Sequence, residues 1–325
     1  MKHLLLTGLI SILLLLPTPL KAHHHIEGFD ITERIMSQSS KNPDSDKSNH
    51  SQADLHDEPI TESFIEVSID KPEHFTQGNS FIVNIKSKKE LTNPKIQFAG
   101  KETKLYKISD GYYRGIAGVD AETKPGGYTI NATDDSNNLN FSEVIEVIAG
   151  NFPIQNISIS GSKASLTATE DELNKVQAAK DAISEKGYWA VKPFITPVSG
   201  CMISPYGRKR YHNGKPTGDY HKGIDIKAPL GRPIYTTEAG KVLIAEDFRL
   251  HGKTVAIDHG QGLMSIYIHM NKIDVKKGDE LKRGQQIGTV GSTGFATGPH
   301  LHWGMYVNSI PVNPNQWIVP VKSCK

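Results

Sequence analysis

Short runs of alternating apolar and polar residues, divided by turn-forming clusters, restrict the first half of this chain to a β fold. Between residues 61 and 149, apolar residues recur at every second position. The runs are Ile65/Val67/Ile69, Phe81/Val83/Ile85, Ile96/Phe98 and Ile145/Val147. Clusters such as Gln77-Gly78-Asn79 and Lys124-Pro125-Gly126-Gly127 separate them. A period of two that breaks at Gly and Pro is typical of strands. We therefore predict a small, immunoglobulin-like β-sandwich over residues 61–150.

Strand-like runs return after Gly200 and alternate with glycine turns. They are residues 242–245, 254–257, 264–268, 286–290 and 302–307. This pattern predicts an antiparallel all-β domain over residues 198–325. The whole chain is thus expected to be mostly β.

One helix is expected in the linker, residues 151–197. Thr169 and Glu172 form the sequence pattern of a capping box, which marks a helix start. An apolar stripe follows and stops at Gly187. Its members are Leu173, Val176, Ala179 and Ile183. The stripe favours ordinary packing over a partner site.

The amino terminus resembles an export signal. Met1-Lys2-His3 precedes an apolar run from Leu4 to Leu16, and Pro17, Pro19 and Ala22 follow it. This order predicts a signal peptide over residues 1–22, removed after Ala22. The run is shorter than the ~20 residues of a spanning helix, so we expect no transmembrane anchor after cleavage. Residues 23–60 are polar and predict a disordered linker.

Charge and cysteine content narrow the remaining possibilities. The formal net charge of +2 over 325 residues gives no reason to expect nucleic-acid binding. The chain has two cysteines, Cys201 and Cys324. An exported protein can keep such a pair as a disulfide, which would join the two ends of the C-terminal domain. The alternative is two unpaired thiols.

The stretch His221-Lys222-Gly223-Ile224-Asp225 offers an imidazole and a carboxylate around a compact spacer. Gly223, the β-branched residues around Asp225 and the nearby Pro229 disfavour a helix. We therefore expect Asp225 on a strand that is entered from a loop. This pair of side chains suits a divalent metal ion.

Two further histidines, His300 and His302, lie at positions i and i+2, so they face the same side of a predicted strand. Catalytic zinc typically takes three protein ligands of nitrogen and oxygen type and leaves one position to water. His221, Asp225 and one of these two histidines would complete that set.

The spacing H-x-x-x-D followed much later by H-x-H resembles that of the lysostaphin-like, or LytM-domain, zinc endopeptidases of bacterial cell-wall peptidoglycan. The resemblance runs from about residue 198 to residue 314. It includes Tyr206-Gly207, Arg210, Asn213-Gly214, Gly223, Ala228 to Pro233, Asp258-His259-Gly260 and Gly291 to Gly294. It implies a LytM-type peptidase domain.

The resemblance also implies roles for single residues. His221, Asp225 and His302 are the expected ligands of one zinc ion per chain, and His269 and His300 are the expected catalytic pair. The sequence has no H-E-x-x-H, so the glutamate base of that metalloprotease class is absent. Histidine would then transfer the proton while zinc activates water. Tyr206, Asn213 and Tyr220 either line the substrate groove or serve packing and turns.

The implied activity is zinc-dependent hydrolysis of peptide crosslinks in peptidoglycan. The alternative is a non-catalytic LytM-type regulator of cell-wall amidases, but such regulators have lost ligands that this chain retains. A carrier domain is a third possibility, because residues 275–288 resemble a lipoyl or biotinyl hairpin, although the modified lysine turn is missing.

Export and a disulfide make the periplasm the expected location, with secretion as the alternative. The predicted N-terminal β domain carries no catalytic set of its own. We expect this domain to act as a spacer, as a docking domain, or as a domain that occludes the active site.

Overall fold

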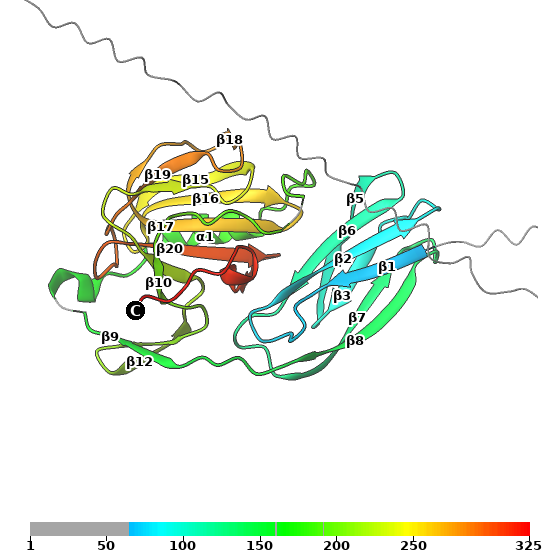
Figure 1. Ribbon diagram of the computed structural model, residues 1–325, viewed down its shortest axis with the longest axis horizontal. Helices are drawn as coiled ribbons and strands as arrows, with labels where there is room; N and C mark the ends of the chain where they lie inside the picture. The colour runs from blue at the N-terminus through cyan, green and yellow to red at the C-terminus, as the bar shows by residue number, and fades with distance from the viewer. Residues whose placement is uncertain (1–64, 160, 191) are drawn as a thin grey trace, which may run out of the picture. The chain divides into compact units, whose positions relative to one another are not determined.

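The structure, a computed structural model, describes residues 65–325 except residues 160 and 191 (Figure 1). The description below concerns the compact unit that ends at residue 325 and begins at residue 60. The predicted signal peptide and the predicted disordered linker lie outside the described residues. Within the described part of the chain, no helix is both long enough and apolar enough to cross a membrane.

Two four-stranded sheets form the N-terminal part, shown in cyan and green in Figure 1. The first has the order β1 (Ile65–Asp70), β2 (Ser80–Ser87), β6 (Tyr112–Gly118), β5 (Tyr106–Ser109). The second has the order β4 (Lys101–Lys104), β3 (Lys95–Phe98), β7 (Gly126–Thr133), β8 (Asn140–Val147). The strand pairings in both sheets are antiparallel.

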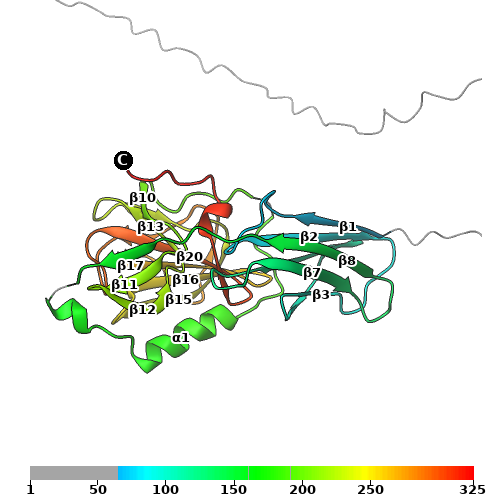
Figure 2. The ribbon, with the colours of Figure 1, turned by 90° about the horizontal axis from the view of Figure 1, so that it is seen from below.

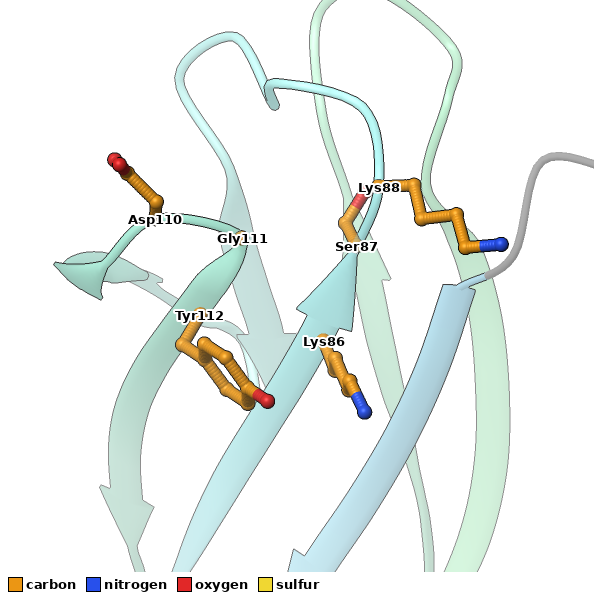
Figure 3. A pocket seen from close by; sticks show the side chains of 6 residues that line it. All are labelled: Lys86, Ser87, Lys88, Asp110, Gly111 and Tyr112. Atoms are coloured by element: carbon orange, nitrogen blue, oxygen red, sulfur yellow. The ribbon is translucent and has the colours of Figure 1, made fainter.

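The core of these sheets contains the apolar residues that the alternation singled out. Phe81 and Ile96 are completely buried, and Phe98 packs edge-on against Phe81 with ring centroids 4.8 Å apart. The first sheet also has a shallow pocket near the β2 and β6 ends (Figure 3). Its lining residues are Lys86, Ser87, Lys88, Asp110, Gly111 and Tyr112.

A ten-stranded sheet forms most of the C-terminal part. Its main path is β10 (Cys201–Ser204), β13 (Ile224–Lys227), β20 (His300–Val307), β17 (Leu263–Ile273), β16 (Gly252–Gly260), β15 (Gly240–Phe248), β18 (Glu280–Leu281). Three more strands join it: β14 (Pro233–Tyr235), β19 (Gln286–Val290) and β21 (Ile310–Val312). All five predicted runs fall on these strands, and the pairings are antiparallel. The mostly β prediction is confirmed.

A smaller three-stranded sheet lies beside it, in the order β12 (Lys215–Tyr220), β11 (Lys209–His212), β9 (Ile154–Ile157). β9 comes from the predicted linker and pairs parallel to β11. The linker therefore contributes a strand to the C-terminal part of the chain.

The predicted disulfide is present. Cys201 and Cys324 are bonded, with their Cα atoms 4.9 Å apart and a sequence separation of 123. Hydrogen bonds flank it: Met202 N donates to Lys322 O at 2.9 Å, and Cys324 N donates to Met202 O at 3.0 Å. The end of the chain is thus fixed to β10.

The linker also holds a short 3-10 helix, η1 (Gly161–Ser165), and the predicted helix, α1 (Glu170–Asp181), visible in Figure 2; a second 3-10 helix, η2 (Pro314–Gln316), follows β21. The apolar stripe is only partly correct. Val176 and Ala179 are buried against β15, but Leu173 is 55% exposed, and Ile183 lies beyond the helix end and is also exposed.

The capping box is half formed. The Thr169 side chain accepts a hydrogen bond from Glu172 N at 3.2 Å, as an N-cap does. The Glu172 carboxylate binds Leu250 and His251 instead, and the side chain is fully buried.

One arginine links the N-terminal sheets to the C-terminal part. The Arg114 guanidinium on β6 lies over the Trp189 ring, 3.6 Å from its centroid, and donates to Gln261 Oε1 at 2.7 Å. Burial lowers the pKa of Arg114 to about 10. A second contact joins Asn308 Nδ2 to Ile116 O at 2.8 Å. Gln261 lies two residues before β17 and Asn308 directly follows β20, and Leu263 pairs with Val307, so both contacts lie at the same end of these paired strands.

Candidate metal centre

The central strands bring three of the predicted site residues together. His221 follows β12, Asp225 is the second residue of β13 and His302 is the third residue of β20. Asp225 and His302 are direct partners in the antiparallel register. As predicted, Asp225 lies on a strand that is entered from a loop.

The ligand atoms of these residues form a compact triangle. His221 Nε2 lies 3.0 Å from Asp225 Oδ1 and 3.0 Å from His302 Nδ1, and the third side of the triangle is 2.9 Å. A tetrahedral ion with bonds of about 2.0–2.1 Å places its ligands about 3.3–3.4 Å apart. The triangle therefore needs to open by only a few tenths of an ångström to fit such an ion, so the three residues are a candidate metal site.

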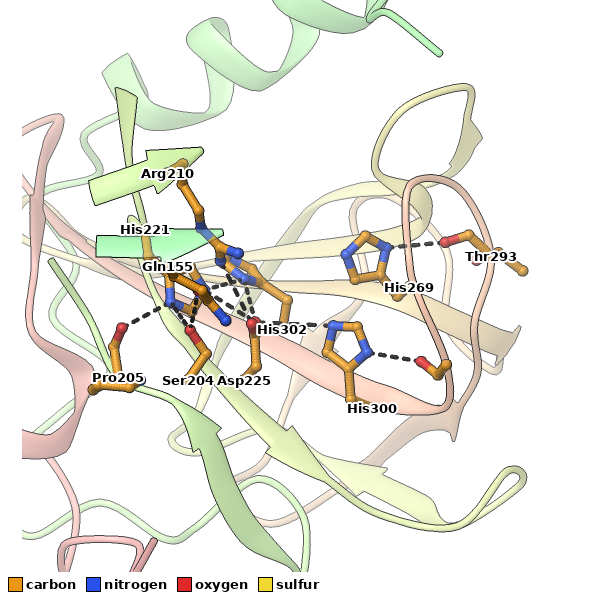
Figure 4. A network of polar contacts seen from close by, with 11 residues as sticks. Gln155, Ser204, Pro205, Arg210, His221, Asp225, His269, Thr293, His300 and His302 are labelled. Carbon is orange, nitrogen blue, oxygen red and sulfur yellow. Dashed lines mark hydrogen bonds and ion pairs between the residues drawn. The ribbon is translucent and has the colours of Figure 1, made fainter. Parts of the chain in front are cut away.

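Neighbouring groups orient His221 (Figure 4). Its Nδ1 lies 2.8 Å from Pro205 O and 3.0 Å from Ser204 Oγ. The Ser204 hydroxyl donates its own proton to Gln155 Oε1 at 2.9 Å, so both oxygens are acceptors for a proton on Nδ1. This tautomer leaves the lone pair of Nε2 facing the site, as a metal ligand requires.

The ionisation states of the three residues also suit a cation. Burial raises the pKa of Asp225, but His221 and His302 prevail and hold it well below its usual range. Burial lowers the pKa of His302 to about 4. Asp225 is therefore ionised and His302 neutral, which are the forms that bind metal. Arg210 Nη2 lies 3.5 Å from the second oxygen of Asp225, the one that faces away from the triangle.

His269 and His300 form a second pair beside the triangle. Their ring centroids are 5.0 Å apart, and His300 Nε2 lies 3.9 Å from Asp225 Oδ1. Each ring donates its Nδ1 proton to a main-chain carbonyl: His269 to Thr293 O at 2.9 Å and His300 to Gly298 O at 2.8 Å. In each ring Nε2 is then the nitrogen that carries the lone pair.

The backbone of His269 is unusual for a non-glycine residue. Its φ is 63°, in the left-handed region, where the β17 pairing with its neighbours is irregular. Such conformations cost energy and concentrate at functional sites. Burial, followed by His300 and His302, holds the pKa of His269 well below its usual range, so the ring is neutral.

Three residues whose roles the sequence left open serve structure. Tyr206 and Tyr220 are buried and pack on each other, with ring centroids 5.8 Å apart. Asn213 occupies the turn between β11 and β12 with a φ of 49°. Its side-chain oxygen accepts from Ile159 N at 2.9 Å, which ties the linker to this turn.

Several supporting residues escaped the sequence reasoning. Ser204 and Thr293 lie in or beside motifs that the resemblance includes, so their neighbourhood was a usable signal. Gln155 carries no such signal, because it lies 49 residues before Ser204 in a strand of the linker. Its role depends on the parallel pairing of β9 with β11.

Comparisons with known proteins agree with this geometry. The model of "Peptidase family M23" matches residues 219–314, which contain all five histidine and aspartate residues of the site. Peptidoglycan DD-endopeptidase ShyA of Vibrio cholerae is 33% identical over 178 residues, covering 55% of this chain and 41% of ShyA. DD-carboxypeptidase/endopeptidase Mpg of Neisseria meningitidis is 35% identical over 139 residues, covering 42% of this chain and 31% of Mpg.

The chain thus spans about two fifths or less of the length of these two relatives. A solved structure is matched over much more of its length. The crystal structure of a candidate peptidase M23 from Pseudomonas aeruginosa has a TM-score of 0.56 and 30% sequence identity, covering 75% of this chain and 94% of the other. This chain belongs to peptidase family M23.

Proposed function

We propose that this protein is a zinc-dependent endopeptidase that hydrolyses peptide crosslinks in bacterial peptidoglycan. The observation that carries the proposal is the triangle of His221, Asp225 and His302 with the free Nε2 atoms of two further histidines beside it. The names of the relatives ShyA and Mpg, both endopeptidases, support this substrate class.

Zinc is the metal that this ligand set suits best. Two imidazoles and one carboxylate make a three-ligand site of nitrogen and oxygen type, the number that catalytic zinc usually takes from the protein. When bound, the ion would lower the pKa of a coordinated water and polarise the scissile carbonyl group.

The proposed work of the protein itself falls to His269 and His300. Their Nδ1 protons are held by Thr293 O and Gly298 O, so each ring can accept or donate a proton only at Nε2. One ring can take the proton of the attacking water, while the other stabilises the charge that develops on the substrate oxygen. The His269 ring is neutral at the start, because burial, followed by His300 and His302, holds its pKa well below the usual range.

Two other functions were considered from the sequence. A regulator of cell-wall amidases would not need an intact ligand triangle with an intact histidine pair, and this chain has both. Membership of family M23 argues against the carrier domain. In addition, residues 275–288, which resemble a lipoyl or biotinyl hairpin, belong to the ten-stranded sheet through β18 and β19.

We propose an extracytoplasmic location, the periplasm in the first place and secretion as the alternative. The support is the Cys201–Cys324 disulfide, since such bonds persist in oxidising compartments, and a substrate that lies outside the cytoplasm.

We also propose a domain arrangement of a β-sandwich over residues 61–150, a linker with a helix over 151–197 and the peptidase over 198–325. The support is that β8 ends at Val147 and β10 begins at Cys201. Occlusion of the active site by the N-terminal domain stays a prediction. The Arg114 and Asn308 contacts do not themselves support it, since they lie at the strand ends away from His269 and His302.

The test uses the purified mature protein and defined crosslinked muropeptides. We expect one zinc per chain by elemental analysis, and mass spectrometry should detect products cut at a peptide crosslink. Asp225→Ala is the matched inactive variant. A zinc-loaded, folded protein that cuts no crosslinked muropeptide, but increases the activity of an added cell-wall amidase, would establish the regulator instead.

A further inference from the structure

Glu172 on α1 is a buried charge that the proposed chemistry does not use. Its side chain is completely buried, although it comes from the linker helix and not from the ten-stranded sheet. A buried carboxylate is costly unless its oxygens are fully hydrogen-bonded. Here Oε1 accepts from His251 N at 2.9 Å and from the His251 ring, and Leu250 N donates to both oxygens at 3.2 Å.

These hydrogen bonds hold a turn, residues 249–251, between β15 and β16. Burial raises the pKa of the Glu172 carboxyl, but the hydrogen bonds from His251 and Leu250 prevail and lower it, so the group stays ionised. A charged acceptor on two consecutive main-chain N–H groups fixes a turn more firmly than a neutral acceptor would.

This turn also makes a direct hydrogen bond with the backbone of His269. The main-chain oxygen of His251 accepts a hydrogen bond from His269 N at 3.1 Å. His269 is the residue whose backbone adopts the costly φ of 63°. The contact from His251 therefore supports a conformation that β17 alone would disfavour.

A second route leads from the same turn to the His269 ring. Leu250 O accepts from Phe295 N at 2.8 Å, and Lys253 N donates to Thr293 Oγ1 at 2.9 Å. These contacts position the loop at residues 293–295, and Thr293 O is the acceptor that orients the imidazole of His269.

We infer that Glu172 is a positioning residue for the reaction: through the turn at residues 249–251 it sets both the backbone and the ring orientation of His269. The inference rests on the proposed function, because it gives a linker residue a part in that same active site. α1 lies outside the residues that the family model matches, so the carboxylate would act on the matched peptidase region from the linker.

The test replaces Glu172 in the full chain and measures turnover and KM with a defined crosslinked muropeptide. Glu172→Gln keeps the size of the side chain but removes its charge and one acceptor. We expect kcat to fall on the order of 10–100-fold, as for other residues that orient a functional group, with KM within about twofold and zinc content unchanged. Asp171→Asn is the matched control, since it removes a charge from the exposed neighbour on the same helix and should leave kcat unchanged.

A double-mutant cycle separates positioning from general stability. In the His269→Ala background, Glu172→Gln should cause no further loss, because the group that it positions is gone. Equal losses in both backgrounds, or a folded Glu172→Gln protein with the wild-type kcat, would overturn the inference. Glu172→Asp, which keeps the charge but withdraws it from the turn, serves if the Gln variant does not fold, and an unchanged kcat in that variant would have the same meaning.

A measurement that does not need activity distinguishes this inference from the proposed function. With ¹⁵N-labelled histidine, the Nδ1–H signal of His269, assigned with His269→Ala, reports its hydrogen bond to Thr293 O. The signal should shift in Glu172→Gln and not in Asp171→Asn. If the wild-type protein cuts no muropeptide, the function is wrong, yet the shift still decides whether Glu172 positions the ring; an unchanged signal shows that it does not.

Discussion

The two histidines of β20 present opposite nitrogen atoms to their surroundings. His302 turns Nδ1 toward Asp225 and His221, whereas His300 gives Nδ1 to Gly298 O and keeps Nε2 free. Both rings lie on the same side of the strand, but their hydrogen bonds differ. This difference suits the roles proposed above, a metal ligand for His302 and a proton-transfer group for His300.

Their variants should therefore fail differently. His302→Ala removes one of three protein ligands, so zinc affinity and activity should both be lost. His300→Ala and His269→Ala should keep nearly stoichiometric zinc but lose about two to four orders of magnitude in turnover. Zinc content and muropeptide cleavage, measured on the same preparations, check this. A folded His300→Ala protein without zinc would show that the two roles are exchanged.

His259 gives a prediction for acid stability. It is fully buried, its Nδ1 donates to Ala239 O at 2.7 Å, and its Nε2 lies 2.8 Å from Ser265 Oγ. Burial lowers its pKa from 6.5 to about 4. Between these values the unfolded chain binds the proton and the folded chain does not, so stability falls as the pH falls from about 6.5 to 4.

The loss attributable to this ring is about 3 kcal/mol over that range. Replacing His259 with Gln removes the titrating group and should flatten this part of the curve of unfolding free energy against pH. The measurement is chemical denaturation of zinc-loaded wild type and variant at several pH values. Parallel curves for the two proteins would contradict the assignment.

At the scale of one strand and its entry loop, Gly223 is fixed by close approach. A Cβ atom there would lie 2.5 Å from Trp303 O and 2.8 Å from His302 Nε2. The main-chain oxygen belongs to β20 and cannot move aside easily. The loop that leads from His221 to Asp225 can therefore pass the β20 backbone only with glycine at this position.

Gly223→Ala should destabilise the fold by about 1–3 kcal/mol and weaken zinc binding, because the added methyl group displaces either the loop or His302. Gly298→Ala is the matched control, since a Cβ there meets nothing within 4 Å. Thermal melting and competition with a zinc chelator measure the two effects. Equal behaviour of the two variants would exclude the steric explanation.

The elements that the sequence predicted well are those with a local signal. A period of two in the apolar residues predicts strands such as β2 and β20. The residues around Asp225 that disfavour a helix predict that it lies on a strand, β13, that is entered from a loop. The resemblance to a family pointed to five candidate site residues, and the structure brings their side chains together, while their roles stay predictions.

Residues that act through distant contacts gave no comparable signal. Glu172 was read as half of a capping box because Thr169 lies three residues before it, but its carboxylate binds a turn 78 and 79 residues away. Pattern reasoning also placed the exposed Leu173 in the buried stripe. A buried glutamate takes that place, which hydrophobic periodicity cannot foresee.

For the molecule as a whole, the disulfide closes a loop of 123 residues around most of the peptidase part. In the chain-entropy model such a crosslink contributes about 4–5 kcal/mol. Reduction, or Cys324→Ser, should lower the melting temperature but leave zinc bound, since neither cysteine is part of the triangle. Thiol titration of the unreduced native protein provides the check, because free thiols there would exclude the bond.

Arg114 tests how the N-terminal sheets bear on activity. Arg114→Ala removes the stacking on Trp189 and the hydrogen bonds to Gln261, so the melting temperature should fall. We expect kcat to change by less than about twofold, because these contacts lie at the β17 end away from His269. Kinetics on the zinc-loaded variant measure this. A clear rise in rate would instead support occlusion by the N-terminal domain.

Because β9 pairs with β11, the sheets of the C-terminal part begin at Ile154, well before the residues of the candidate metal centre. A polypeptide cut at residue 198 would convert β11 from an inner strand of its sheet into an edge strand. Its free main-chain N–H and C=O groups could then pair with the same edge of a second molecule. Shortened forms of this protein would thus tend to self-associate, and a useful boundary for producing the C-terminal part alone lies before Ile154.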